Sequence, residues 1–292
     1  MTETAGIHAG AGIIDGAAVA ALVRAATKAS ARAFIERHGR QPGLATLLVG
    51  DNPASATYVA GKHRAAAALD IASIDRSLPQ TASQAEVEAV VAELVARDDT
   101  DGVLVQMPLP DHLDPEPVIL LVPPAKDVDG FHPTNVGAIA TGLQGTASCT
   151  PAGVMTLLDH YGVELPGADV VVVGRSRTVG MPMALLLLQR NATVTVTHLL
   201  TKDLARATRE ADVLVVAAGH PGLITRDMVK PGAVVIDIGI TRTPEGLRGD
   251  VAFDEVREVA RLISPVPGGV GPMTIATLMS HTVALAWARA GK

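Results

Sequence analysis

The sequence DVVVVGRSRTVG, residues 169–180, decides the fold. Its four consecutive valines predict a short strand buried on both faces, as the strands of a parallel sheet are. Gly174 ends this strand and Gly180 opens a helix, and a glycine turn at a helix N-terminus allows a negatively charged ligand to approach the backbone closely. The spacing G-x-S-x-x-x-G departs from the usual G-x-G-x-x-G. Both a dinucleotide-binding loop and an unliganded strand-to-helix turn therefore remain open for this stretch.

Helical and strand patterns alternate on the C-terminal side of this loop. The elements predicted there are strands at residues 170–173, 193–197, 213–217 and 234–238 and helices at residues 183–190 and 204–210. Alternation of this kind produces a parallel sheet with right-handed crossovers, the architecture of Rossmann-type domains. The second half of the chain is therefore predicted to be a dinucleotide-binding domain.

The first half also alternates helices with strands, and it carries the polar residues that suit chemistry. The elements predicted in the rest of the chain are helices at residues 17–37, 54–69, 84–96, 151–161 and 273–290, strands at 44–49 and 102–106, and irregular structure around a short helix at 111–131. Tyr58, Lys62, Gln106 and Asp129 all precede the glycine loop. This order predicts a substrate domain followed by a dinucleotide domain, hence the α/β class.

Composition excludes several classes of protein. Of 292 residues 48% are hydrophobic and only 2% aromatic, so the cores are expected to consist of Ala, Val, Leu and Ile. A net charge of −6 without a Lys/Arg block argues against a nucleic-acid partner. One cysteine fits a reducing cytosol, the apolar stretch at 183–188 is too short to span a bilayer, and residues 1–12 lack a signal-peptide pattern. We expect a soluble cytoplasmic protein without a membrane partner.

Tyr58 and Lys62 are four residues apart and share one face of a predicted helix. A lysine shielded from water can have its pKa lowered toward neutrality and act as a base, although an ordinary exposed pair has the same spacing. Short-chain dehydrogenases also use Y-x-x-x-K, but theirs follows the glycine loop in the same domain. Here the pair precedes the loop by more than a hundred residues, which excludes that class.

Asp127 and Asp129 lie in the stretch KDVDG, residues 126–130. They fit a metal pair, a turn, or an anchor for the N–H groups of a polar heterocycle, because carboxylates make strong charge-assisted hydrogen bonds. Too few ligands accompany them for a calcium loop, and the histidines show no metal spacing, so no metal site is predicted. His281 and the other histidines are interpreted as unremarkable polar residues.

Cys149 stands just before a predicted helix start, a position that can lower a thiol pKa. No arrangement of His or Asn nearby in the sequence supports a thiol nucleophile. Cys149 is therefore interpreted as structural.

The strand after the glycine loop bears on the choice of cofactor. An NAD site commonly has Asp or Glu at the end of that strand, for the ribose hydroxyl. This chain has THLLT at residues 197–201, without a carboxylate, while Arg175 and Arg177 lie in the loop. A missing acid together with available arginines favours a 2′-phosphate and hence NADP, unless the arginines are merely solvated.

Taken together, these segments resemble the bifunctional methylenetetrahydrofolate dehydrogenase/methenyltetrahydrofolate cyclohydrolase (FolD-type) family over nearly the whole chain. The segments that carry the resemblance are VGDNPASATYVAGK (49–62), DGVLVQMPLP (101–110), KDVDGFHP (126–133), CTP (149–151), VGRS (173–176), DIGI (237–240) and PVPGGVGPMT (265–274). Each segment alone is modest evidence. Seven of them in the family's order are highly specific.

The resemblance implies two α/β domains flanking a cleft, usually in a homodimer. The first would be a folate-binding catalytic domain of residues 1–148 plus 273–292, and the second a Rossmann-type NADP-binding domain of residues 149–272. It implies oxidation of 5,10-methylenetetrahydrofolate to the 5,10-methenyl form, and hydrolysis of the latter to 10-formyltetrahydrofolate. These reactions belong to one-carbon metabolism and purine biosynthesis.

The same resemblance assigns roles to individual residues. Lys62 would be the base of the hydrolysis, Tyr58 would stack on or orient the folate, Gln106 would tune Lys62, and Asp129 would hold the pterin edge. The remaining contacts that it implies are Pro267, Gly268 and Gly269 to the folate and Gly174, Arg175, Ser176 and Ile240 to the cofactor.

Three positions depart from the family's pattern. Ala17 replaces a common lysine, Met181 replaces a lysine near the cofactor loop, and Leu199 stands where some relatives have serine. The last two keep NAD open as the cofactor. A shikimate-type dehydrogenase, a non-catalytic dinucleotide-binding protein and a dehydrogenase without cyclohydrolase activity are the alternatives. A shikimate-type dehydrogenase does not account for the loop at 265–272. A non-catalytic binding protein has no need of Tyr58 with Lys62, and a dehydrogenase without cyclohydrolase activity would have no need of Lys62.

Overall fold

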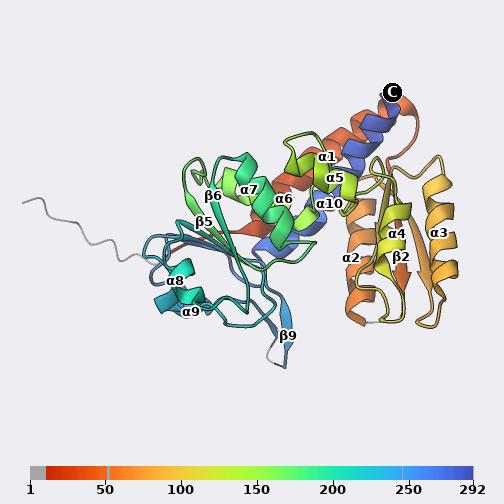
Figure 1. The fold of residues 1–292 in the computed structure, drawn as a ribbon. Coiled ribbons are helices and arrows are strands. Elements are labelled where there is room, and N and C mark those ends of the chain that lie inside the picture. Colours follow the sequence, from red (N-terminus) through yellow and green to blue (C-terminus); the bar gives the residue numbers. More distant parts are fainter. Residues whose placement is uncertain (1–10, 51–52, 245, 292) are drawn as a thin grey trace, which may run out of the picture. The chain divides into compact units, whose positions relative to one another are not determined.

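The computed structural model describes residues 11–50, 53–244 and 246–291, and for residues 53–60 the backbone alone. The chain divides into two compact units (Figure 1). Unit 1 comprises Met1–Val19 and Thr150–Met273, and unit 2 comprises Ala20–Cys149 and Thr274–Lys292. Two long helices, α1 (Gly16–His38) and α10 (Val270–Ala290), each contribute residues to both units.

Unit 1 is built on a six-stranded sheet in which every pair of neighbouring strands is parallel. In spatial order the strands are β1 (Gly12–Ile13), β11 (Leu262–Ile263), β8 (Val234–Asp237), β7 (Val213–Val216), β5 (Asp169–Val173) and β6 (Thr193–Thr197). The central strands are fully buried valine runs, because helices cover a parallel sheet on both faces. The other elements are α6 (Cys149–His160), α7 (Gly180–Gln189), α8 (Leu204–Thr208), η1 (Arg226–Met228), α9 (Phe253–Val256) and the hairpin β9 (Thr241–Thr243)–β10 (Gly246–Arg248).

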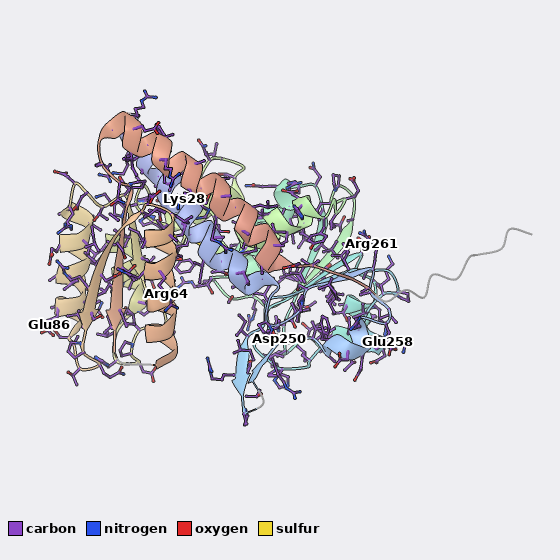
Figure 2. The ribbon with its side chains drawn as sticks, turned by 180° about the vertical axis from the view of Figure 1, so that it is seen from behind. Lys28, Arg64, Glu86, Asp250, Glu258 and Arg261 are labelled. Carbon is purple, nitrogen blue, oxygen red and sulfur yellow. The ribbon has the colours of Figure 1, made fainter. Side chains whose placement is uncertain are left out.

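Unit 2 has a smaller parallel sheet in the order β3 (Ala72–Leu78), β2 (Gly43–Val49), β4 (Gly102–Val105). Its helices are α2 (Pro53–Ala68), α3 (Gln84–Ala96), α4 (Pro115–Leu121) and α5 (Pro133–Ala140), together with most of α1 and α10. Figure 2 shows α1 and α10 side by side. Trp287 of α10 packs edge-on against Phe34 of α1, with ring centroids 5.3 Å apart, and its Nε1 donates to Ser30 Oγ at 3.1 Å.

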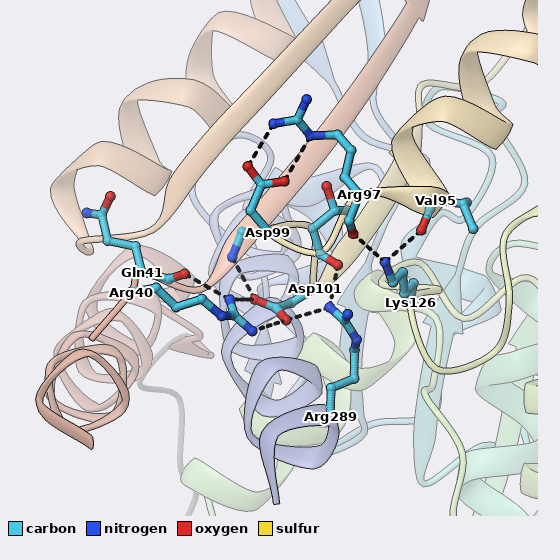
Figure 3. A network of polar contacts seen from close by, with 10 residues as sticks. Arg40, Gln41, Val95, Arg97, Asp99, Asp101, Lys126 and Arg289 are labelled. Atoms are coloured by element: carbon cyan, nitrogen blue, oxygen red, sulfur yellow. Dashed lines mark hydrogen bonds and ion pairs between the residues drawn. The ribbon is translucent and has the colours of Figure 1, made fainter. Parts of the chain in front are cut away.

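A buried carboxylate anchors α10 to this sheet (Figure 3). Asp101, just before β4, is fully buried and accepts two bonds from Arg40, at 2.7 and 2.9 Å, and one from Arg289 of α10 at 2.7 Å. The backbone N–H of Gly43 at the start of β2 donates to it at 2.9 Å. One side chain therefore joins two strands and the C-terminal helix, at the end of β4 opposite to Gln106.

The predicted fold class is confirmed: the chain has two α/β units, and unit 1 contains the parallel sheet. The prediction missed β3, the short strands β1 and β11, and the β9–β10 hairpin, and α6 begins at Cys149 rather than at residue 151. The predicted domain boundaries differ from the two units at the N-terminus. Strand β1 pairs with β11, so residues 11–19 group with unit 1 instead of with residues 20–148. No helix in the described ranges is long and apolar enough to cross a membrane.

Candidate functional site

Lys62 and Gln106 meet in unit 2. Lys62 lies on α2 and Gln106 directly follows β4, where the following Met107–Pro108 peptide ends the strand. Lys62 Nζ donates to Gln106 Oε1 at 2.9 Å. The amide of Gln106 is oriented by its own Nε2, which donates to the Met107 carbonyl at 2.7 Å. This second bond turns the amide oxygen of Gln106 toward Lys62.

The turn that carries Asp129 is shaped by its neighbour Asp127. The two carboxylate oxygens of Asp127 accept the backbone N–H groups of Gly130 and His132, each at 2.9 Å. Asn135 Nδ2 adds a third bond at 2.9 Å. Asp127 therefore acts as a turn residue, one of the three roles (metal pair, turn or heterocycle anchor) that the sequence left open for this acidic pair. No cluster of metal-binding side chains occurs among the residues that the structure describes.

Asp129 is close enough to Lys62 for each to shift the pKa of the other. Burial raises the pKa of Asp129 to about 6, and the positive charge of Lys62 opposes that rise. Burial also lowers the pKa of Lys62 from its ordinary value, while Asp129 opposes the change. A lysine whose pKa is lowered can exist in part as the free amine that a general base requires.

A small recess adjoins Asp129. Its volume is about 20 Å³, enough for about one water molecule. Its lining is mostly apolar and consists of Val103, Val105, Met107, Ile119, Val122, Asp127, Asp129 and Phe131. The carboxyl of Asp129 thus lies at an apolar surface, where a hydrogen bond to a ligand is shielded from water.

Tyr58 lies on α2, one helical turn before Lys62, as predicted. Its side chain is outside the described residues, so its role toward a substrate stays a prediction.

One interpretation of the sequence is corrected in unit 2, and one is kept. Cys149 stays interpreted as structural, because burial and the nearby Asp129 raise the pKa of its thiol well above the ordinary value. His281 is more than an unremarkable polar residue, since its Nδ1 lies 3.1 Å from the carbonyl oxygen of Val128 and 3.7 Å from Cys149 Sγ. These residues are 132 positions apart, and no local pattern connects them.

The glycine loop of unit 1 forms a tight strand-to-helix turn. Gly174 has φ of 133°, and a Cβ there would meet the Ala217 carbonyl oxygen at 2.2 Å. A Cβ on Gly180 would meet the Gly174 carbonyl oxygen at 2.2 Å, so both positions require glycine. Ser176 Oγ accepts the backbone N–H groups of Val179 and Gly180, at 3.1 and 3.3 Å.

A cavity of about 370 Å³ opens at this loop. Its lining consists of Gly174, Arg175, Ser176, His198, Leu199, Leu200, Ala217 and Ala218. The three loop residues predicted to bind a cofactor therefore meet at one cavity with the end of the neighbouring strand β6. None of these lining residues is acidic, and Arg175 is exposed. The tight backbone turn and the helix N-terminus suit the phosphates of a dinucleotide, and Arg175 adds a positive charge beside them.

The loop at 264–269, which precedes α10, also belongs to unit 1. Pro267 follows a cis peptide bond, and Gly268 has φ of 103°. A Cβ on Gly269 would meet the carbonyl oxygen of Pro265 at 2.5 Å. Ile240, after β8, is 44% exposed. Pro267, Gly268, Gly269 and Ile240 thus lie in the unit with the glycine loop, while Lys62, Gln106 and Asp129 lie in unit 2.

Sequence reasoning missed a pair of buried carboxyl groups behind the cavity. Asp250, labelled in Figure 2, accepts the backbone N–H groups of Ala218 and Gly219 at 2.7 and 2.8 Å. Asp237 accepts three more, from Gly239, Asp250 and Val251, at 2.9 to 3.0 Å. The motif DIGI contained Asp237, but nothing in the sequence indicated that Asp250 would position the Ala218 loop.

Comparison with known proteins gives a consistent result. The family model described as tetrahydrofolate dehydrogenase/cyclohydrolase, catalytic domain, matches residues 14–129, and its NAD(P)-binding counterpart matches residues 148–290. The bifunctional protein FolD 2 of Frankia casuarinae is 53% identical over 279 residues, which are 96% of this chain and 97% of the relative.

Solved structures agree with these sequence matches. A bifunctional FolD methylenetetrahydrofolate dehydrogenase/cyclohydrolase from Campylobacter jejuni is 46% identical, with a TM-score of 0.93 over 95% of this chain and 99% of that one. The Trypanosoma brucei enzyme, complexed with NADP cofactor and inhibitor, is 38% identical, with a TM-score of 0.93 over 97% and 99%.

Proposed function

Because the chain belongs to the tetrahydrofolate dehydrogenase/cyclohydrolase family, we propose that it catalyses two consecutive reactions on a folate. The first oxidises 5,10-methylenetetrahydrofolate to the 5,10-methenyl cation. The second hydrolyses that cation to 10-formyltetrahydrofolate. The observation that carries the proposal is the contact of Lys62 with Gln106 beside Asp129, because it supplies an amine whose pKa burial lowers, next to an anchor for a polar heterocycle.

The oxidation requires positioning more than proton transfer. The nitrogen lone pair of the folate expels a hydride from the one-carbon bridge, so this step needs no protein base. When bound, a nicotinamide dinucleotide would supply the acceptor for that hydride. Gly174 and Gly180 allow its phosphates to approach the backbone at the start of α7, and Asp250 holds the Ala218 edge of the cavity in place.

The hydrolysis is where Lys62 acts. Its free amine takes a proton from water as the oxygen bonds to the methenyl carbon. The bond from that carbon to the ring nitrogen N5 then breaks as the hydroxyl becomes the formyl C=O. The proton held by Lys62 passes to N5, the hydroxyl proton leaves to solvent, and the formyl group stays on N10. Gln106 accepts a hydrogen bond from Nζ and thereby fixes the direction of the nitrogen lone pair. Asp129, as a carboxylate, accepts N–H groups of the pterin edge and orients the ring.

We propose NADP as the cofactor. Arg175 lines the cavity at the end of β6, where an NAD site would place a carboxylate, and the lining residues contain none. The Trypanosoma brucei relative complexed with NADP supports the same choice. Met181 and Leu199 replace the lysine and serine of the family's pattern, so the nucleotide preference is to be measured with both cofactors.

Three further properties complete the proposal. We propose a homodimer, since β6 is an edge strand whose unpaired backbone groups can bind a second copy, and Val196 on it is 39% exposed. A net charge of −6 argues against nucleic-acid binding, and the single buried cysteine fits the cytoplasm. The 10-formyl product would serve as a one-carbon donor in purine biosynthesis.

The experiment mixes purified protein with 5,10-methylenetetrahydrofolate and NADP⁺ or NAD⁺, and follows reduced cofactor, methenyl and 10-formyl products together. Formation of reduced cofactor and of 10-formyl product faster than the spontaneous rates would establish both reactions. Comparison of the rates with NADP⁺ and NAD⁺ would show which nucleotide the enzyme prefers. Reduced cofactor without enzymatic 10-formyl formation would leave a dehydrogenase alone and remove the role of Lys62. Absence of reduction with either nucleotide would refute the proposal.

A further inference from the structure

The residue before Asp129 is held by two side chains from distant parts of unit 2. Val128 is fully buried, and its carbonyl oxygen lies 3.1 Å from His281 Nδ1 and 3.2 Å from Cys149 Sγ. A carbonyl oxygen only accepts, so the N–H of His281 donates to it, and the thiol of Cys149 lies within reach to donate to it as well. Burial lowers the pKa of His281, so the ring is neutral near pH 7 and its single hydrogen is on Nδ1.

The rest of this turn is held by nearby groups. The Lys126 carbonyl accepts Val103 N–H at 2.7 Å, and Asp127 fixes the backbone of Gly130 and His132. The peptide between Val128 and Asp129 lies between these fixed points. Its orientation decides where the Asp129 side chain points, and His281 reaches it from α10, 153 positions along the chain.

The thiol of Cys149 has one hydrogen and two acceptors. The first acceptor is the Val128 carbonyl, and the second is the carboxyl of Asp129, whose pKa the thiol helps to lower. When His281 satisfies the Val128 carbonyl, the thiol hydrogen is free for Asp129. When His281 is absent, a buried carbonyl competes for the same hydrogen, because leaving it unpaired is costly.

We propose that His281 is a positioning residue for folate binding. Its Nδ1–H holds the peptide that carries Asp129 and leaves the Cys149 thiol to support the Asp129 carboxyl. The effect on folate rests on the function proposed above, in which Asp129 binds the pterin edge.

Two substitutions of opposite geometry test the proposal. In His281→Asn the side-chain amide nitrogen can occupy the place of Nδ1, whereas in His281→Gln it lies near the place of Nε2. We expect His281→Asn to keep the folate KM of the wild type. We expect His281→Gln to raise it about threefold to tenfold, the size of one lost hydrogen bond. The cofactor KM should change less than about twofold in either variant, because the cavity at Gly174 lies in unit 1.

A control variant separates positioning from the packing of α10. His38 of α1 packs against Trp287 of α10, with ring centroids 5.4 Å apart. Among the described residues, no hydrogen bond joins His38 to Val128. His38→Ala should lower the melting temperature and leave the folate KM unchanged. If His38→Ala raises the folate KM as much as His281→Gln does, loosening of α10 explains both and the proposal is wrong.

Cys149 supplies a second readout that does not depend on catalysis. It is the single cysteine of the chain and is only 4% exposed, so the rate at which a chromogenic disulfide labels the native enzyme reports opening at this point alone. We expect faster labelling in His281→Gln, by about threefold to tenfold, and an unchanged rate in His281→Asn.

The outcomes distinguish this inference from the proposed function. An active wild type with equal folate KM and equal labelling rates in the Asn and Gln variants would overturn the inference and leave the function intact. A wild type that oxidises no folate would overturn the proposed function and the link to folate. The contrast in labelling would then still decide whether His281 holds the Val128 peptide.

Discussion

Replacing Lys62 by methionine should separate the two activities. Methionine is similar in length and apolar, so it retains the packing of the half-buried side chain and removes the amine that donates to Gln106 Oε1 at 2.9 Å. A positioned general base contributes about 10²- to 10⁴-fold to a rate. We therefore expect 10-formyl production to fall by about that factor, or roughly 3–5 kcal/mol in activation free energy. Oxidation needs no base and should continue.

The charge of Lys62 has a second effect, on folate binding. It lowers the pKa of Asp129, which burial raises to about 6. Without that charge the pKa of Asp129 rises further, and more of the carboxyl is protonated at pH 7. The folate KM of Lys62→Met should accordingly be raised at pH 7 and recover at about pH 8–9, once the carboxylate forms again.

Lys62→Arg distinguishes the base from the charge. A guanidinium keeps the positive charge next to Asp129 but does not deprotonate near neutrality. This variant should bind folate nearly as the wild type does and lose the hydrolysis. Progress curves for the methenyl and 10-formyl products at several pH values measure both quantities, and unfolding followed by the fluorescence of Trp287 checks the fold. Wild-type 10-formyl production by Lys62→Met would refute the role of the base. Equal loss of both activities by Lys62→Met at every pH would make Lys62 structural.

Four other predictions concern Asp129, Arg175 and Asp101. Asp129→Ala should raise the folate KM about 10- to 100-fold, the size of a charge-assisted hydrogen bond, and an unchanged KM contradicts the anchor. The pKa of Asp129 is about 6 in the folded protein, above its ordinary value of 3.8. This carboxyl therefore stabilises the fold most at low pH, and its contribution to the free energy of unfolding is lost as pH rises through 6. In urea titrations the Asp129→Asn variant should not show this pH-dependent loss of stability. The wild-type folate KM should fall over the same range as the carboxylate forms. Arg175→Ala should raise the KM for NADP⁺ about tenfold or more and leave that for NAD⁺ nearly unchanged; equal effects would place the 2′-phosphate elsewhere. Asp101→Asn should lower the free energy of unfolding by about 3–5 kcal/mol, because it leaves Arg40 and Arg289 without their buried anion, and a loss below about 1 kcal/mol would show that the network is not stabilising.

Sequence patterns predicted the parts of the fold that depend on burial on both faces. The valine runs of β5, β7 and β8 lie where they were expected, because a central parallel strand must be apolar throughout. Strand β3 was missed because it is an edge strand, and its sequence ASIDRSL includes charged residues that face solvent. Strands β1 and β11 have two residues each, too few to show any period.

The residues of the candidate site differ in the same way in how far the sequence could predict them. Lys62, Gln106 and Asp129 could be proposed from the sequence because the family resemblance covers their motifs, and the structure adds the distance between Lys62 and Gln106. His281 could not be, because only the packing of α10 brings it to Val128. Asp250 likewise acts through backbone N–H groups of another loop, and hydrogen bonds to backbone leave no pattern in the sequence.

A raised carboxyl pKa does not by itself mark a functional group in this chain, and the comparison of Asp129 with Asp237 shows why. Burial raises the pKa of both carboxyl groups, that of Asp129 to about 6 and that of Asp237 to about 7. Asp237 receives three backbone N–H groups from residues on either side of the β9–β10 hairpin, so its oxygens are occupied in holding that segment. The neighbours that shift the pKa of Asp129 are instead side chains, among them the Lys62 amine and the Cys149 thiol. Side chains can exchange protons or rotate when a ligand arrives, whereas backbone N–H groups cannot. This difference supports the role proposed above for Asp129, whereas Asp237 holds the framework of unit 1.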